Sequence, residues 1–100
     1  MNQIHKLNIG IIGGGQLGKM ILSESNRMSL NTSVLDSNKN SPCKNLTNNF
    51  IVGDLNNYND VLEFGKKCDI ITFEIEHINV DALTQLQKSG KKVYPKPETL

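Results

Sequence analysis

The chain has 100 residues, of which 37% are hydrophobic and 21% are charged, a composition that indicates one globular domain and argues against disorder. Its 11 basic and 10 acidic residues leave a net charge of +1, so charge gives no reason to expect binding to nucleic acid or to a membrane surface. No apolar run approaches the roughly 18 residues needed to cross a bilayer, and the N-terminal MNQIHK lacks the apolar stretch of a signal peptide. We therefore expect a cytoplasmic protein.

A glycine-rich turn follows the first predicted strand, an apolar run over Leu7–Ile12. Gly13, Gly15 and Gly18 fit the G-x-G-x-x-G spacing that turns a parallel strand into a helix. In this motif the first glycine allows a tight turn, the second lets the backbone approach a ligand, and the third lets the helix pack closely on the strand. An apolar stripe predicts that helix over residues 16–28. The N–H groups at its start suit an anion, usually a phosphate.

The second predicted strand, Ser33–Asp36, ends in a carboxylate. Asp36 follows Gly18 at about the distance at which an NAD-binding domain places the acid that binds the ribose. Alternatively, Asp36 closes the strand and bonds the backbone of the turn that follows it. Position alone leaves both interpretations open. A polar loop is predicted over Ser37–Asn49.

Strands and helices alternate along the rest of the chain. The further strands are predicted at Phe50–Val52, Asp69–Phe73 and Lys92–Tyr94. Asn59 and Asn79 are the expected N-caps of the two intervening helices, and Gly90 is the expected end of the second. The helix residues expected to be buried are Val61, Leu62, Phe64, Val80, Leu83 and Leu86. This alternation predicts an α/β fold, a doubly wound parallel sheet of about five strands with helices on both faces.

The two cysteines, Cys43 and Cys68, form no CxxC motif and have no zinc-ligand spacing with a histidine. We expect free thiols, with Cys68 partly in the core. No metal site is predicted from these residues.

Two acidic residues, Glu74 and Glu76, follow the predicted strand Asp69–Phe73. In an extended chain they would face the same side, at the strand end where doubly wound sheets bind ligands. Two carboxylates there would repel a dinucleotide pyrophosphate. They would suit a ligand with an anion at the glycine turn and an amine or hydroxyls further along. Either residue could instead be a solvated loop acid.

Several segments occur together in the order and spacing of one known family. They are Gly13–Met20, Val34–Asp36 with Ser41–Pro42, Cys68–Glu76 and Tyr94–Leu100. Together they resemble the N-terminal domain of the N5-carboxyaminoimidazole ribonucleotide synthetases, which are ATP-grasp enzymes of purine biosynthesis. The resemblance implies a Rossmann-like pre-ATP-grasp domain over residues 1–94, with residues 95–100 starting the linker to an ATP-grasp domain. His77 departs from the asparagine expected at its position, so it is given no role.

The resemblance implies a ligase that carboxylates 5-aminoimidazole ribonucleotide with bicarbonate while cleaving ATP, using Mg²⁺. The residues implied in substrate binding are Gly15, Gln16 and Leu17 at the phosphate and Glu76 at the ribose or amine side. The residues implied to support them are Gly13, Gly18, Asp36 and Glu74.

In this family the ATP and Mg²⁺ ligands lie in regions outside this domain. The resemblance therefore implies no catalytic residue and no metal ligand among these 100 residues, and no activity of the chain alone. It also implies a homodimer for the full-length enzyme, with small molecules rather than nucleic acid or membrane as partners. The alternative is the NAD-binding domain of an oxidoreductase, which Asp36 favours and the Glu74–Glu76 pair opposes.

Overall fold

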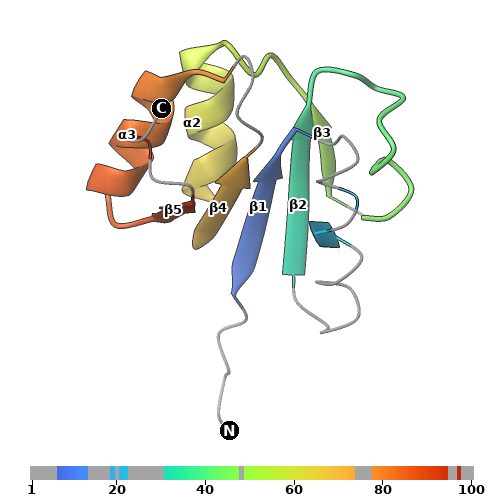
Figure 1. Cartoon of the computed structure of the whole chain (residues 1–100), viewed down its shortest axis with the longest axis horizontal. Helices are drawn as coiled ribbons and strands as arrows, with labels where there is room; N and C mark the ends of the chain where they lie inside the picture. Colours follow the sequence, from blue (N-terminus) through green and yellow to red (C-terminus); the bar gives the residue numbers. More distant parts are fainter. Residues whose placement is uncertain are drawn as a thin grey trace, which may run out of the picture.

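The structure is a computed structural model that describes residues 7–13, 19, 21–22, 31–47, 49–73, 78–94 and 97. These residues contain a five-stranded, wholly parallel sheet in the order β3-β2-β1-β4-β5 (Figure 1). Its strands are β1 (Asn8–Ile12), β2 (Asn31–Asp36), β3 (Phe50–Val52), β4 (Ile70–Phe73) and β5 (Lys92–Tyr94). Two helices, α2 (Tyr58–Lys66) and α3 (Val80–Lys88), join β3 to β4 and β4 to β5. The predicted α/β fold with a five-stranded parallel sheet is confirmed.

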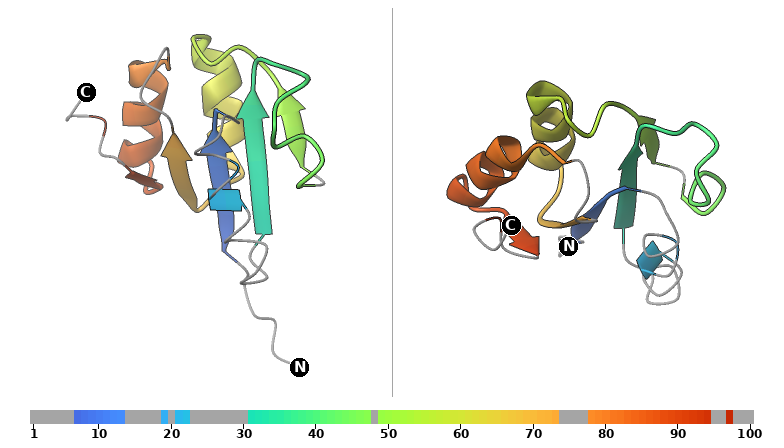
Figure 2. Two further views of the ribbon diagram at one scale, coloured as in Figure 1. Left: turned by 45° about the vertical axis from the view of Figure 1, so that its right-hand side comes forward. Right: turned by 45° about the horizontal axis from the view of Figure 1, so that its top comes forward.

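Both faces of the sheet carry a hydrophobic core, because successive strand residues point to opposite faces. Ile12 of β1 belongs to the larger core cluster, which also contains the buried side chains of α2 and α3. Its neighbour Ile11 belongs to a smaller cluster with Leu22 and Cys43. Figure 2 shows α2 and α3 side by side on one face and the helical segment that contains Leu22 on the other. The sheet is therefore doubly wound.

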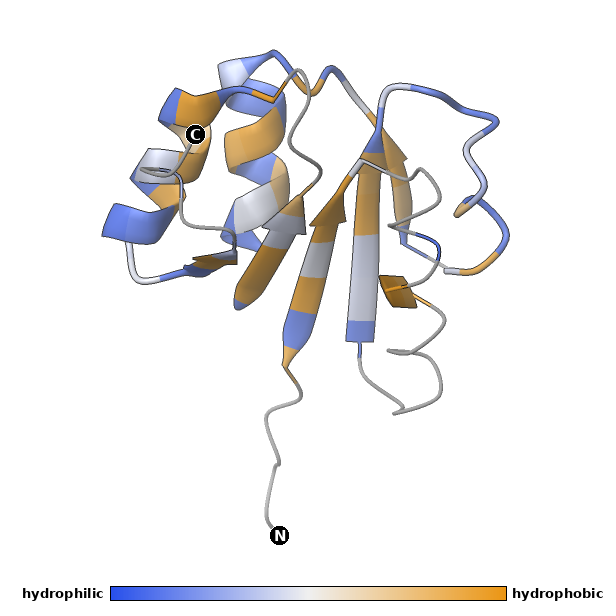
Figure 3. Cartoon of the chain, in the orientation of Figure 1, coloured by the Kyte–Doolittle hydropathy of each residue, from blue (hydrophilic) through white to orange (hydrophobic). Residues whose placement is uncertain are grey.

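Apolar residues lie mainly in the carboxyl-terminal halves of β1 and β2 and in β4, whereas the long connection after β2 is mostly hydrophilic (Figure 3). No helix in the part of the chain described by the structure is long and apolar enough to cross a membrane. Cys43 and Cys68 form no disulfide, as expected, and both are buried.

The N-cap of α2 differs from the prediction. Asn57, not Asn59, caps this helix by accepting a hydrogen bond from the N–H of Asp60 at 2.9 Å. Several asparagines lie near the start of this helix. Asn57 is the cap because it lies three residues before Asp60, whose backbone N–H has no acceptor within the first turn. The sequence shows the candidates but does not distinguish between them.

The N-cap of α3 is Asn79, as predicted, and it accepts from the N–H of Ala82 at 2.9 Å. Gly90 follows the end of α3 with a φ of +102°. Val80, however, is 40% exposed, so its predicted burial is wrong. The buried stripe runs through Ala82, and a residue two positions earlier lies about 200° around the helix, which points Val80 away from the core.

Two glycines let α2 lie close to its neighbours, and the sequence analysis singled out neither. A Cβ on Gly10 of β1 would lie 2.5 Å from Cys68 Sγ and 2.9 Å from Phe64 Cε2. A Cβ on Gly65 would collide with Cδ1 of Leu86 on α3. A side chain at either position would therefore force the neighbouring side chains, or α2 itself, to shift.

Candidate ligand-binding site

The carboxyl ends of β1 and β4 lie side by side at the centre of the sheet (Figure 1). Between β1 and β2, Ile21 and Leu22 pack with the smaller core cluster. Between β4 and β5, α3 packs in the larger cluster on the opposite face. Connections that diverge in this way mark the switch point of an open α/β sheet, the place where such sheets bind ligands. Ile12 and Phe73, the last residues of these strands, are register partners. The two segments predicted to bind ligand therefore start next to each other.

Gly13 begins the turn out of β1. It is buried, its φ is +95°, and its N–H donates to the carbonyl of Leu35 at 2.7 Å. A residue with a side chain rarely adopts this φ, so the tight turn predicted at Gly13 requires a glycine. The hydrogen bond holds the start of the glycine-rich turn against the end of β2.

Asp36 lies half-buried at the end of β2. Its Oδ1 accepts a long hydrogen bond from the N–H of Asn38 at 3.4 Å, and its carbonyl accepts from the N–H of Gly53 at 3.0 Å. The carboxylate therefore bonds the turn after the strand, which was one of the two interpretations left open. Its role in supporting a ligand stays a prediction.

Most of the predicted site residues lie outside the part of the chain that the structure describes. They are Gly15, Gln16, Leu17, Gly18, Glu74 and Glu76, and His77 lies outside it as well. The residues that border them are described. Ile21 and Leu22 are helical, as predicted for the helix after the glycines, and Phe73 and Ile78 are buried on either side of the Glu74–Glu76 segment.

Asn79 has a second set of contacts that sequence analysis missed. Its backbone N–H donates to the carbonyl of Leu55 at 2.8 Å, and its Nδ2 donates to the carbonyl of Asn56 at 3.0 Å. The cap was visible in the sequence because it is local. These two bonds join positions more than 20 residues apart, and no local pattern signals them.

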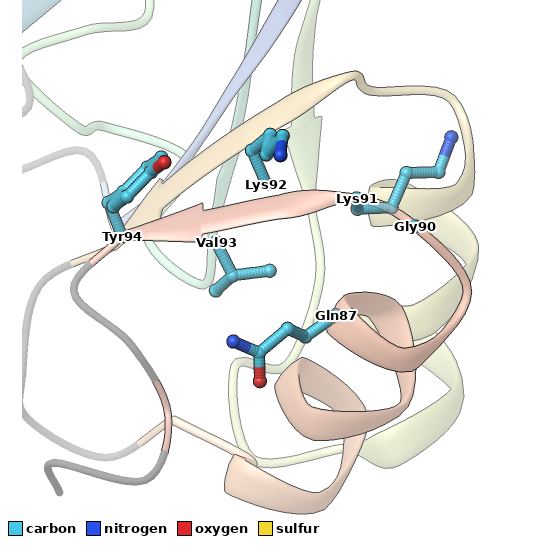
Figure 4. Close-up of a pocket in the computed structure, with 6 residues that line it drawn as sticks. All are labelled: Gln87, Gly90, Lys91, Lys92, Val93 and Tyr94. Atoms are coloured by element: carbon cyan, nitrogen blue, oxygen red, sulfur yellow. The ribbon is translucent and has the colours of Figure 1, made fainter.

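Two of the pockets that border the described residues lie away from the carboxyl ends of β1 and β4. The larger, about 350 Å³, lies beside the outer strand β5, where Val93 points toward Gln87 and Tyr94 and Lys92 point the other way (Figure 4). The smaller lies between β3 and α2, and its volume of about 180 Å³ is below the roughly 300 Å³ typical of small-molecule sites.

Neither the Cys68 thiol nor a cluster of metal ligands among the described residues points to catalysis. Burial raises the pKa of the Cys68 thiol to about 11; nearby Lys91 lowers this pKa, and Asp69 raises it further. A thiol with this pKa stays protonated at neutral pH and does not act as a nucleophile. Within the described ranges, no group of three or more His, Cys, Asp and Glu side chains could hold a metal ion.

A wholly parallel sheet in this strand order, with a positive-φ glycine directly after β1, defines a Rossmann-like domain. Residues 6–100 match the family described as the ribonucleotide synthetase preATP-grasp domain. The chain belongs to this family. The resemblance found in the sequence is thereby confirmed, and the NAD-binding oxidoreductase is not favoured.

Named relatives agree with this assignment. The phosphoribosylaminoimidazole carboxylase of Candida glabrata is 45% identical over 96 residues, which cover 92% of this chain and 17% of the relative. The N5-carboxyaminoimidazole ribonucleotide synthase of Staphylococcus haemolyticus is 42% identical over 78 residues, covering 78% of this chain and 21% of the relative. The chain therefore spans about a fifth of the length of these proteins.

Solved structures share the fold. The N5-carboxyaminoimidazole ribonucleotide synthetase of Thermotoga maritima matches with a TM-score of 0.86 and 38% identity over 93% of this chain and 26% of that one. The N5-carboxyaminoimidazole synthase of Aspergillus clavatus, solved in complex with ADP and 5-aminoimidazole ribonucleotide, matches with a TM-score of 0.80 and 34% identity. That match covers 93% of this chain and 25% of the Aspergillus protein.

Proposed function

We propose that this chain is the ribonucleotide-binding domain of an ATP-dependent ligase that carboxylates 5-aminoimidazole ribonucleotide with bicarbonate. Its membership in the ribonucleotide synthetase family supports this function, as does the likeness to an Aspergillus enzyme solved with that ribonucleotide. The geometric observation that carries the proposal is the register of Ile12 with Phe73, from which the glycine-rich turn and the Glu74–Glu76 segment both start.

In this proposal the two segments bind opposite ends of the ribonucleotide. The backbone of Gly15, Gln16 and Leu17 binds the phosphate, because N–H groups at the start of a helix attract an anion. Glu76 accepts hydrogen bonds from the ribose hydroxyls or the amine, which carry the donors that a carboxylate needs. The supporting residues are Gly13, Gly18, Asp36 and Glu74.

The ligase as a whole needs further parts. ATP supplies the energy that drives carboxylation, and we assign the ATP and Mg²⁺ ligands to regions beyond this domain, as the family resemblance implies. Residues 1–94 form the ribonucleotide-binding domain in this proposal, and residues 95–100 begin the link to an ATP-grasp domain. The full-length enzyme is a cytoplasmic homodimer. The 100 residues alone are expected to show no bicarbonate-dependent ATP hydrolysis, and such hydrolysis by the purified chain would contradict this division of roles.

Titration of the isotope-labelled chain with 5-aminoimidazole ribonucleotide and with NAD, followed by amide NMR, tests the binding role. We expect shifts at Gly15, Gln16, Leu17 and Glu76 with the ribonucleotide alone. Glu76→Gln removes the carboxylate charge and should weaken binding about tenfold, the worth of one charge-assisted hydrogen bond.

Glu63→Gln is the matched control, because Glu63 lies exposed on α2 and pairs with Lys66 at 2.9 Å. It removes the same charge away from the carboxyl ends of β1 and β4 and should leave the affinity unchanged. Shifts with NAD but not with the ribonucleotide would refute the proposal, and so would equal effects of the two glutamine substitutions.

A further inference from the structure

The two outer strands of the sheet, β3 and β5, have three residues each but differ in the residues that protect their edges (Figure 1). Lys91 precedes β5, Lys92 begins it, and Pro95 follows it directly in the sequence. Lysine and proline at an outer strand keep other strands from pairing with it. Residues 48–53, which include β3, contain no proline and no charged residue. The edge of the sheet at β3 therefore lacks this protection.

The backbone of β3 directs two pairs of hydrogen-bonding groups outward. The carbonyl of Asn49 and the N–H of Gly53 both bond the backbone of β2, at 3.0 Å. The N–H and C=O groups of alternate residues in a strand face the same neighbour. Those of Phe50 and Val52 therefore face away from β2, along the outer edge of the sheet, where they can pair with a further strand.

Apolar side chains accompany this edge on both faces of the sheet. Ile51 is 40% exposed and Val52 is 56% exposed, and successive strand residues point to opposite faces. Ile51 is the register partner of Leu35, which belongs to the larger core cluster, so Ile51 lies on the face that carries α2. There it lines the pocket of about 180 Å³ between β3 and α2. A strand paired with β3 would cover Ile51 and Val52 together.

The side of α2 that borders this pocket is acidic toward its start and basic at its end. Asp60 lies in the first turn, Glu63 follows one turn later, and Lys67 is the C-cap. All three residues are exposed and line the pocket. A second α2 that ran in the opposite direction would bring its basic end toward the acidic end of the first. The charges of this surface are therefore complementary to those of a second copy of the same chain.

We propose that β3 is a dimerisation edge, at which the β3 strands of two copies of this chain pair antiparallel about a two-fold axis at Ile51. With the axis there, Phe50 of each copy lies opposite Val52 of the other, and all of their outward N–H and C=O groups are paired. The same axis makes the two α2 helices antiparallel on one face of a continuous sheet. This inference builds on the homodimer of the proposed function and names the surface through which its copies meet.

Sedimentation velocity of the chain tests the association over about a hundredfold range of protein concentration, since a dimer dissociates on dilution. The mass should rise toward twice that of the monomer. Amide hydrogen exchange under the same conditions locates the contact. Exchange at Phe50 and Val52 should slow as the concentration rises, whereas exchange at Ile51, whose N–H faces β2, should change little.

Val52→Pro removes one outward N–H and keeps the bonds of β3 to β2, and proline is tolerated at such a position of an outer strand. A two-fold interface loses this hydrogen bond twice, so the dissociation constant of the dimer should rise about thirtyfold. Val80→Pro is the matched control, because Val80 is 40% exposed and begins α3, where proline is tolerated. It should leave the dissociation constant unchanged.

Lys67→Glu tests the charges and stands in for Val52→Pro if that variant fails to fold. It should raise the dissociation constant of the dimer about fivefold, because two favourable charge contacts become repulsive. This effect should shrink at high salt. Lys88→Glu is the matched control, since Lys88 is also an exposed lysine at the end of a nine-residue helix, and α3 packs against β5 rather than β3. It should not change the association.

The outcomes separate this inference from the proposed function. A wild-type chain that stays monomeric at every concentration would overturn the dimerisation edge and leave β3 to a strand of another protein. Equal dissociation constants in Val52→Pro and Val80→Pro, or in Lys67→Glu and Lys88→Glu, would place the dimer contact elsewhere and overturn it too. A chain that dimerises through β3 but does not bind 5-aminoimidazole ribonucleotide would refute the binding role and leave the dimerisation edge intact.

Discussion

The contact between β1 and α2 makes a quantitative prediction about Gly10. In Gly10→Ala, the new methyl group would lie 2.5 Å from Cys68 Sγ and 2.9 Å from Phe64 Cε2, both shorter than van der Waals contact. Phe64 and Cys68 are 5% and 2% exposed, so neither has free space into which it can move. The strain must therefore be relieved by moving α2 or β1.

The magnitude follows from two opposed effects. Overpacking of a dense core costs about 1–3 kcal/mol, while replacing glycine in a strand recovers about 0.5–1 kcal/mol of backbone entropy, so the net loss should be about 1–2 kcal/mol. For a domain of this size each kcal/mol corresponds to a fall of about 4–8 °C in melting temperature. Urea unfolding followed by circular dichroism measures the loss, with an unchanged m-value as the sign that the unfolded state is unaffected.

A double-mutant cycle with Cys68→Ala identifies the cause. Removing Sγ leaves the Cβ of residue 68 at 3.3 Å from the new methyl, so Gly10→Ala should cost about 1 kcal/mol less in the Cys68→Ala background. A Gly10→Ala protein as stable as the wild type would refute the close approach of β1 and α2. Equal costs in both backgrounds would show that the Cys68 sulfur is not the obstacle.

Three further outcomes follow from the same structure. Gly90→Ala should lower the free energy of unfolding by about 1 kcal/mol because of the φ of +102°, although no atom lies near a Cβ at this position. Gly90→Asn should recover part of this loss in the same urea assay, since asparagine adopts a positive φ more readily. Leu86→Ala should cost about 2–5 kcal/mol, because Leu86 is 1% exposed, and the exposed Val80→Ala, its control, should cost far less. Burial raises the pKa of Cys68 from 9.0 to about 11, so its thiol stabilises the fold fully below pH 9 and loses this contribution as pH rises toward 11. Urea titrations at pH 8 and pH 10.5 should therefore show that the free energy of unfolding falls less between these pH values in Cys68→Ala than in the wild type. Identical falls in the two proteins would contradict the raised pKa.

Much of the fold could be predicted because its signals are local. The alternation of apolar strands with capped helices predicts the parallel sheet, and β3 and β5 have the predicted bounds. Asn79 was predictable as a cap because its partner lies three residues away. The same chemistry failed for α2, where several asparagines were available and only the folded chain selects Asn57.

The remaining features depend on contacts between distant parts of the chain. In the sequence, Gly10 is indistinguishable from an ordinary strand residue. Its close approach to Cys68 and Phe64 arises only when α2 packs against β1. Nothing near Asn79 in the sequence indicates that its Nδ2 reaches Asn56. Such contacts are set by how the helices pack on the sheet, so residue patterns alone do not contain them.

The candidate site stands between these two cases. The glycine-rich turn and the Glu74–Glu76 pair were each visible locally, and both were expected at the carboxyl edge of the sheet. The strand ends from which they start are adjacent, because β1 lies between β2 and β4 and Ile12 pairs with Phe73. In the proposed function the glycine-rich turn takes the phosphate of one small ligand and the carboxylates take its hydroxyl or amine donors, which this starting geometry supports. If β4 lay at the outer edge of the sheet, at least one strand would separate the starts of the two motifs. Each intervening strand would add about 4.8 Å to the distance between them, and one ribonucleotide would have to span this added distance.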